Sequence, residues 1–146
     1  MSESTYHHPK PRMWETELKN WEQTMSQQEL GLHLSFILHK FVQPELHPIL
    51  EDITKCFQYP EDTLRWEIFE KAQTLGFDTP TGALALALFW SHGSMSPEGL
   101  EPVYPDPSLV PQMLHCVSVM CVTKFAEIPE HGTQLLISHS VKVGGT

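Results

Sequence analysis

The sequence has no run of about 18 apolar residues, and its N-terminal segment lacks the apolar core of a signal peptide. A helix needs about that many apolar residues to cross a bilayer. We therefore expect no membrane span and, as the default, a cytoplasmic protein.

Lysine and arginine are scarce: nine basic residues stand against eighteen acidic ones, which gives a formal net charge of −9. The interval between Lys71 and Lys124 contains neither residue type, although Glu98, Glu101 and Asp106 lie in it. An excess of negative charge disfavours nucleic-acid backbones and anionic membrane surfaces as partners. We expect neither, and instead a protein partner whose surface is basic or neutral.

Cysteine is also rare, and the histidines do not form metal-ligating patterns. Cys56, Cys116 and Cys121 lie inside apolar helical segments, so we predict buried free thiols. His33 and His39 would lie about 240° apart around a helix, and Cys116 and Cys121 about 140° apart. Neither pair shares a helix face as an i, i+4 ligand pair does. We therefore expect no metal and no cofactor.

Catalytic motifs are missing as well: there is no phosphate-binding glycine loop and no dinucleotide fingerprint. Hydroxyls and an imidazole do gather in Ser91-His92-Gly93-Ser94. A nucleophile elbow, however, requires Gly-x-Ser-x-Gly on a strand-to-helix turn. Here Gly93 directly precedes Ser94 and the segment follows a predicted helix, so Gly93 is better interpreted as a left-handed helix cap. We assign no catalytic residue.

Helical periodicity is the main positive signal. Apolar residues recur at spacings of three and four, whereas no segment alternates convincingly with period two, although 138–143 offers a short candidate strand. The predicted helices span 13–25, 27–42, 45–58, 60–75, 80–91 and 109–127, with a short last helix at 133–141. The fold class is all-α, a compact bundle of five to seven helices with one long proline-rich loop. We expect a single domain at 12–141, a disordered tail at 1–11 and a flexible end at 142–146.

Several residues mark the ends of these helices. Ser26 and Glu29 form a capping-box pattern, and Gly76 is placed as a C-terminal cap. Thr79 and Ser108 are predicted N-caps, and Pro60 is predicted at the first helical position.

The helix predicted at 80–91 is apolar at every position from 83 to 90. It therefore has almost no face for solvent, and we predict that it is the central helix of the bundle. Leu84, Leu86, Leu88 and Phe89 are expected in the core on more than one of its sides.

A proline-rich loop from residue 91 to 107 follows this helix. Compact domains rarely keep structureless connections longer than about 12 to 15 residues unless they bind something or are disordered. We predict that the loop is a contact surface for a protein partner. The predicted partner-binding residues are Trp90, His92, Met95, Pro97, Leu100, Glu101, Pro102, Tyr104 and Pro105. Trp90 and Tyr104 are candidate aromatic anchors, although Trp90 is better explained as core and Tyr104 could simply hold the loop in place.

The Thr-Pro start at residues 79–80, the Phe-Trp-Ser-His-Gly-Ser turn at 89–94 and the prolines that follow resemble a family of small bacterial proteins of unassigned function. The resemblance covers about residues 60–126. It implies a helical bundle and an association with type VI secretion clusters, and it implies no catalytic residue.

These observations favour a non-enzymatic protein–protein interaction module, an accessory or adaptor protein of a bacterial secretion system. Two alternatives stay open. A homo-oligomeric structural protein would bury an exposed apolar patch in a symmetric interface. A small-molecule-binding or hydrolytic domain would have a deep pocket with polar groups converging near His92 and Ser94.

Overall fold

The computed structural model describes residues 13–144, which form seven α-helices and one short 3₁₀ helix, without a strand in this range. The helices are α2 (Met13–Gln23), α3 (Gln27–Phe41), η1 (Pro44–Leu46), α4 (His47–Gln58), α5 (Asp62–Leu75), α6 (Pro80–Ser91), α7 (Leu109–Lys124) and α8 (Pro129–Gly144). The predicted all-α bundle is confirmed. The predicted domain boundaries stay predictions, since residues 1–12 and 145–146 lie outside the described range.

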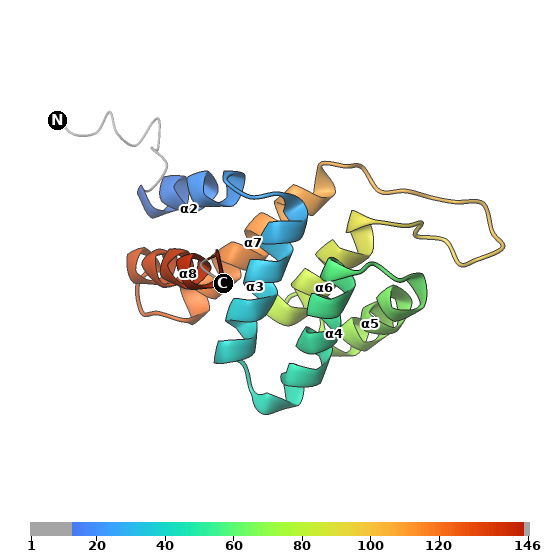
Figure 1. Cartoon of the computed structure of the whole chain (residues 1–146), viewed down its shortest axis with the longest axis horizontal. Helices are drawn as coiled ribbons and strands as arrows, with labels where there is room; N and C mark the ends of the chain where they lie inside the picture. The colour runs from blue at the N-terminus through green and yellow to red at the C-terminus, as the bar shows by residue number, and fades with distance from the viewer. Residues whose placement is uncertain (1–12, 145–146) are drawn as a thin grey trace.

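Helix α6 is the centre of the bundle, as its sequence predicts. It packs against α3, α4, α5 and α7, while α2 and α8 pack on each other at the end of the bundle remote from α5 (Figure 1). Leu84, Leu88 and Phe89 are buried in the core. Leu86 is only half-buried, so the expectation that it belongs to the core is wrong.

Three of the predicted helix ends have the expected geometry. In the capping box, the Ser26 hydroxyl accepts from the Glu29 amide at 3.1 Å, and the Glu29 carboxylate accepts from the Ser26 amide at 2.9 Å. The Thr79 side chain accepts from the Gly82 amide at 3.1 Å at the start of α6. Gly76 ends α5 with φ of 95°, a conformation that favours glycine.

One predicted helix start is wrong, and one predicted capping bond is absent. Helix α5 begins at Asp62, so Pro60 lies before the helix and not at its first position. Ser108 makes no side-chain capping bond. The Asp106 carboxylate instead forms a local turn before the helix, because it accepts from the Ser108 amide and hydroxyl at 2.9 and 2.8 Å. These bonds hold the pKa of the Asp106 carboxyl below its usual value.

The C-terminal part also differs from the prediction. Helix α7 ends at Lys124 rather than 127, and α8 starts earlier and ends later than the predicted 133–141. Residues 138–143, the candidate strand, are therefore helical. Pro129 opens α8, where its missing amide hydrogen leaves no helical bond unmade.

The cysteines are free thiols, but only two of the three are buried. Cys56 and Cys121 lie in the core, whereas Cys116 is exposed on α7, so its predicted burial is wrong. Burial raises the pKa of the Cys121 thiol to about 12. This thiol is accordingly unreactive at neutral pH.

No helix within residues 13–144 is by itself both long and apolar enough to cross a membrane; α7 and the first part of α8 meet the criterion only as a pair, bent by 116° between them.

Candidate functional site

The loop at residues 92–108 leaves the bundle between α6 and α7 and extends beyond the ends of the helices (Figure 1). We call this segment the finger. Its tip is a tight turn in which the Leu100 amide donates to the Pro97 carbonyl at 3.2 Å. Gly99 occupies the turn position that needs a positive φ, with φ of 91°.

Hydrogen bonds hold the two arms of the finger together. The Ser94 hydroxyl oxygen accepts from the amides of Ser96 and Val103 at 3.0 and 2.9 Å. The Met95 amide donates to the Val103 carbonyl at 2.7 Å. Since the arms meet near their base and again at the tip turn, the finger has a defined shape despite containing no helix or strand.

Arg65 of α5 supports the base of the finger from inside the protein. Its side chain is 1% exposed. Its Nε donates to the Phe89 carbonyl at 3.0 Å, and its Nη2 donates to the Ser94 carbonyl at 2.6 Å. The guanidinium lies 4.1 Å from the Phe89 ring centroid and pairs with Asp62 at 2.6 Å. These contacts tie α5, the end of α6 and the finger to one buried charge.

Gly93, at the base of the finger, lies against Arg65, and two observations explain why this position is a glycine. Its φ is 81°, in the left-handed region that favours glycine; α6 itself ends at His92 in an extended conformation, so the predicted left-handed cap is wrong. A β-carbon at this position would lie only 2.6 Å from Nη1 of Arg65. The position of the buried arginine therefore favours glycine at residue 93.

Sequence reasoning missed Arg65. A signal was available, because Arg65 lies three residues before Ile68 and seven before Ala72, on the stripe of α5 that faces the core. An arginine on an apolar stripe indicates a buried charge that needs several acceptors.

The finger exposes large apolar side chains. Leu100 is 65% exposed, Val103 49% and Tyr104 68%. Pro97, Glu101 and Pro102 are exposed beside them. Of the other predicted partner-binding residues, Met95, Pro105, His92 and Trp90 are half-buried, and Trp90 packs against the core. The finger therefore brings together most of the predicted residues, and their role in binding stays a prediction.

An acidic hollow of about 420 Å³ lies between the finger tip and α5. Its lining includes Asp62, Glu67, Glu70 and Glu98 around the half-buried ring of Trp66. This surface suits a basic side chain, because carboxylates attract it and an aromatic face binds cations.

His92 lies at the base of the finger with one ring nitrogen bonded and the other unpaired. The Ser91 hydroxyl donates to the Leu88 carbonyl at 2.6 Å, and Ser91 Oγ lies 2.8 Å from Nδ1 of His92. Since the single hydroxyl hydrogen is already used, Nδ1 must carry the hydrogen and donate to Ser91. Nε2 of neutral His92 is then an acceptor, and it is buried without a partner among the described residues.

This arrangement does not activate a serine. A general base would have to accept the hydroxyl hydrogen, whereas the His92 ring donates to Ser91. The Ser94 hydroxyl is held by Val103 and Ser96 instead. The polar groups of the cluster thus shape the base of the finger.

Burial lowers the pKa of His92, and the nearby positive charge of Arg65 lowers it further against a weaker opposing effect of Asp62. Because the folded pKa lies below the unfolded value, folding favours the neutral ring. Its contribution to stability is present above the ordinary pKa of about 6.5 and is lost as the pH falls through the folded pKa.

We expect His92→Phe to lose less thermal stability than the wild type when the pH is lowered from neutral into the window between the ordinary pKa of histidine and the lower pKa of folded His92. Melting temperatures of both proteins, measured by circular dichroism across the window, check this. Equal losses would show that His92 does not take up a proton on unfolding. Since other histidines titrate in the same range, the difference between the two proteins is the informative quantity.

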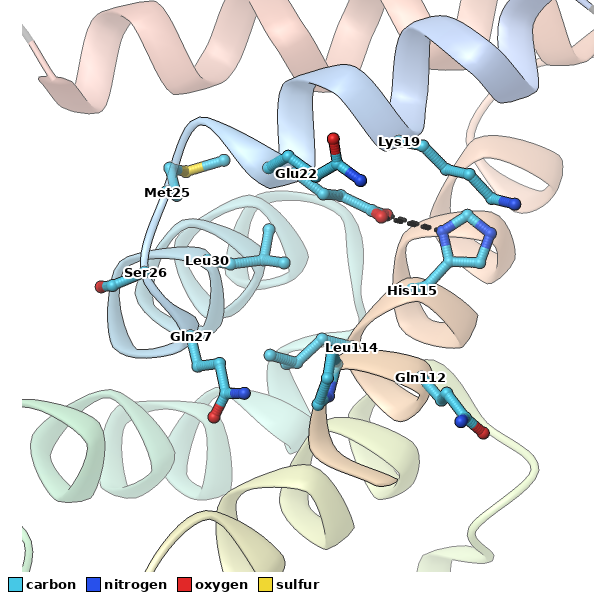
Figure 2. Close-up of a pocket in the computed structure, with 11 residues that line it drawn as sticks. Lys19, Glu22, Met25, Ser26, Gln27, Leu30, Gln112, Leu114 and His115 are labelled. Atoms are coloured by element: carbon cyan, nitrogen blue, oxygen red, sulfur yellow. Dashed lines mark hydrogen bonds and ion pairs between the residues drawn. The ribbon is translucent and has the colours of Figure 1, made fainter. Parts of the chain in front are cut away.

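A second groove, of about 500 Å³, lies between the end of α2, the start of α3 and the first turns of α7 (Figure 2). Glu22 and His115 meet there, with Nδ1 of His115 2.9 Å from both carboxylate oxygens. Met25, Leu30 and Leu114 supply apolar lining. The Glu22–His115 pair joins the end of α2 to α7, a contact that sequence reasoning did not identify.

We expect Glu22→Ala to lower the free energy of unfolding by about 1 to 2 kcal/mol, since it removes a charge-assisted hydrogen bond from a largely buried carboxylate. The Glu22 side chain is 11% exposed. Urea unfolding measures the change. The matched control is Glu51→Ala, which breaks the more exposed Glu51–His39 pair and should change stability by less than about 0.5 kcal/mol. Equal effects would show that Glu22 does not fix α2.

Within the described residues, no group of three or more histidine, cysteine, aspartate or glutamate side chains is arranged to hold a metal ion.

Comparison with known protein families gives a match. Residues 35–139 match the model of a family described as "Family of unknown function (DUF6931)". No curated protein and no solved structure matches the chain. The match includes Arg65, His92 and the whole finger, whereas α2 lies outside it. The resemblance to a helical family without an assigned function is confirmed at this level. The chain belongs to the DUF6931 family.

Proposed function

We propose that the protein is a non-enzymatic interaction module that binds another protein through the finger. The observation that carries this proposal is the exposure of Leu100, Val103 and Tyr104 on a loop that hydrogen bonds hold in one shape. Exposed apolar side chains on a preorganised loop lose little conformational entropy on binding, which is typical of contact surfaces.

Charge indicates the kind of partner. Glu98, Glu101 and Asp106 are exposed on the finger, and the acidic hollow beside α5 adds further carboxylates. Arg65, which binds the base of the finger, is buried and already paired. A partner segment with basic or neutral residues complements this surface, and its lysine or arginine side chains would bind in the acidic hollow.

We also propose that the partner belongs to a bacterial secretion apparatus of type VI, for which the protein acts as an accessory or adaptor. The support is the sequence resemblance in the helix, turn and proline-rich loop at residues 79–107. The family match carries no function of its own.

The test is affinity capture from the native host with three forms of the full chain. The finger variant combines Tyr104→Ala with Glu101→Lys. The matched control combines Ile128→Ala with Glu127→Lys, which makes the same kind of change at exposed positions between α7 and α8. All three must first show the same melting temperature.

We expect the wild type and the control to recover the same partner and the finger variant to lose it. Recovery of the same partner in equal amount by all three forms would place the interface elsewhere. Recovery of only a second copy of this chain would favour the homo-oligomer instead.

A further inference from the structure

The arm of the finger that returns to α7 is an extended, proline-rich segment. It comprises residues 101–107, with the sequence Glu-Pro-Val-Tyr-Pro-Asp-Pro, and we call it the proline arm. Residues 101–106 form no helix, strand, turn or bend, and the peptide bonds of the arm are trans. The arm therefore runs without a sharp change of direction between the finger tip and the start of α7 (Figure 1).

The covalent structure of the chain imposes this extended shape. Each of the three prolines has φ restricted to about −65°. The residue before each proline is disfavoured in the helical region and adopts an extended or polyproline II conformation. Together these effects restrict every residue of the arm except Val103. Val103 is fixed by the opposite arm, because its amide donates to the Ser94 hydroxyl at 2.9 Å and its carbonyl accepts from the Met95 amide at 2.7 Å.

The proline arm presents apolar rings in a regular arrangement. A polyproline II segment has about three residues per turn, so residues three apart lie on the same edge. Pro102 and Pro105 therefore share one edge of the arm. Tyr104 shares another edge with Glu101. The side chains on these edges are accessible, since Pro102, Glu101 and Tyr104 are exposed and Pro105 is half-buried.

Two modes of recognition suit an extended segment: it can add a strand to the edge of a partner sheet, or it can dock in a groove. Strand addition requires a regular series of amide donors, and the three prolines of the arm have none. Docking in a groove requires instead accessible proline rings and a conformation that is already extended. The proline arm meets both requirements, so docking in a groove is favoured.

The chemistry of the groove follows from the side chains of the arm. Aromatic side chains line the grooves that bind proline-rich segments, and they would pack on the rings of Pro102, Pro105 and Tyr104. The exposed carboxylates of Glu101 and Asp106 lie at the two ends of this apolar stretch. A lysine or arginine beside the groove would complement them.

We propose that the proline arm is the ligand of a partner domain that has a shallow groove of aromatic side chains with a basic residue beside it. This inference rests on the proposed function and adds the chemistry of the partner's binding surface. The arm loses little conformational entropy when it docks, because its prolines and the bonds of Val103 already hold it extended.

The first test adds two competitor peptides to the affinity capture with the full chain. One peptide has the sequence of residues 101–107. The other has alanine in place of the three prolines and keeps both carboxylates. We expect the proline peptide to displace the partner at a concentration about tenfold lower, because the alanine peptide lacks the rings and must lose more conformational entropy on binding.

The second test compares two double variants of the full chain, after equal melting temperatures have been confirmed. Pro102→Ala with Pro105→Ala changes the arm. Pro44→Ala with Pro48→Ala is the matched control, since these prolines are exposed and lie outside the finger. We expect the arm variant to bind the partner about tenfold more weakly and the control to bind it like the wild type.

NMR of the wild-type chain gives a direct readout of an aromatic groove. Protons that lie over an aromatic ring shift upfield, so the ring protons of Pro102 and Pro105 should shift upfield when the partner is added. Those of Pro44 and Pro48 should not shift. This measurement and the peptide competition are independent of how the variants fold.

The outcomes separate this proposal from the proposed function. Equal displacement by both peptides, displacement by neither, or proline signals that do not shift upfield would overturn the aromatic groove. If the captured partner were still lost from the Tyr104→Ala, Glu101→Lys variant, the finger would remain the interface. Capture of no finger-dependent partner would overturn both proposals.

Discussion

Arg65→Ala is expected to lower the free energy of unfolding by about 3 to 5 kcal/mol, which is typical of breaking a buried charged network. The substitution leaves the carbonyls of Phe89 and Ser94 without their donor. It also opens a cavity beside the Phe89 ring. Because the finger is tied to α5 through this side chain, the finger should loosen before the bundle unfolds.

Two measurements check this prediction. Urea unfolding gives the change in stability, and hydrogen exchange reports on the amides of Met95 and Val103, which are bonded within the finger. Lys71→Ala is the control, since the Lys71–Asp52 pair is exposed and its ion-pair distance is 4.0 Å. An Arg65→Ala protein as stable as the Lys71→Ala protein would show that the buried arginine does not support the fold.

Leu88→Ala is expected to lower the free energy of unfolding by about 2 to 5 kcal/mol. Leu88 is fully buried in α6, and that helix packs against four others. The surrounding helices cannot all move to fill the space left by the side chain, so the loss should include a cavity contribution.

The half-buried Leu86, on the same helix and with the same side chain, is the matched control. We expect Leu86→Ala to have a clearly smaller effect in the same urea experiment, because part of its surface already contacts water. A loss below about 0.5 kcal/mol for Leu88→Ala, the size typical of exposed positions, would mean that α6 is not central to stability.

Local signals in the sequence predicted much of the fold. The capping box at Ser26, the Thr79 cap and the glycine stop at Gly76 each involve residues at most four apart, so their physics is visible in a short window. The apolar run in α6 predicted a central helix because such a helix has no polar face for solvent. Leu86 departs from this rule, since the run alone cannot tell which side of the helix lies nearest the surface.

Errors arose where neighbouring groups compete for the same role. Ser108 has the residue type of an N-cap, but its hydroxyl donates to Asp106 instead. Pro60 fits a first helical position in isolation, yet α5 begins two residues later. In both cases the residue types were suitable and the choice between adjacent alternatives depended on the surrounding structure.

Contacts between distant segments could not be predicted at all. Glu22 and His115 are 93 residues apart, and the Nη2 bond from Arg65 spans 29 residues to Ser94. Helical periodicity predicts which face of a helix a residue occupies. It does not predict which distant segment packs against that face. The candidate site was likewise only partly predictable. The length and acidity of the finger were visible in the sequence, whereas the burial of Arg65 and the environment of the His92 ring were not.

The exposed carboxylates of the finger have a practical consequence for mapping its contacts by chemical cross-linking. Amine-reactive reagents have no lysine to modify anywhere on this protein between Lys71 and Lys124, and trypsin would release the whole interval as one long peptide. Carbodiimide instead activates carboxylates. Glu98, Glu101 and Asp106 are accessible, so they would join directly to lysines of a bound partner. Any such amide link reports a carboxylate and an amine that were already in contact, so the reagent that suits this surface is also the one that would identify a basic partner.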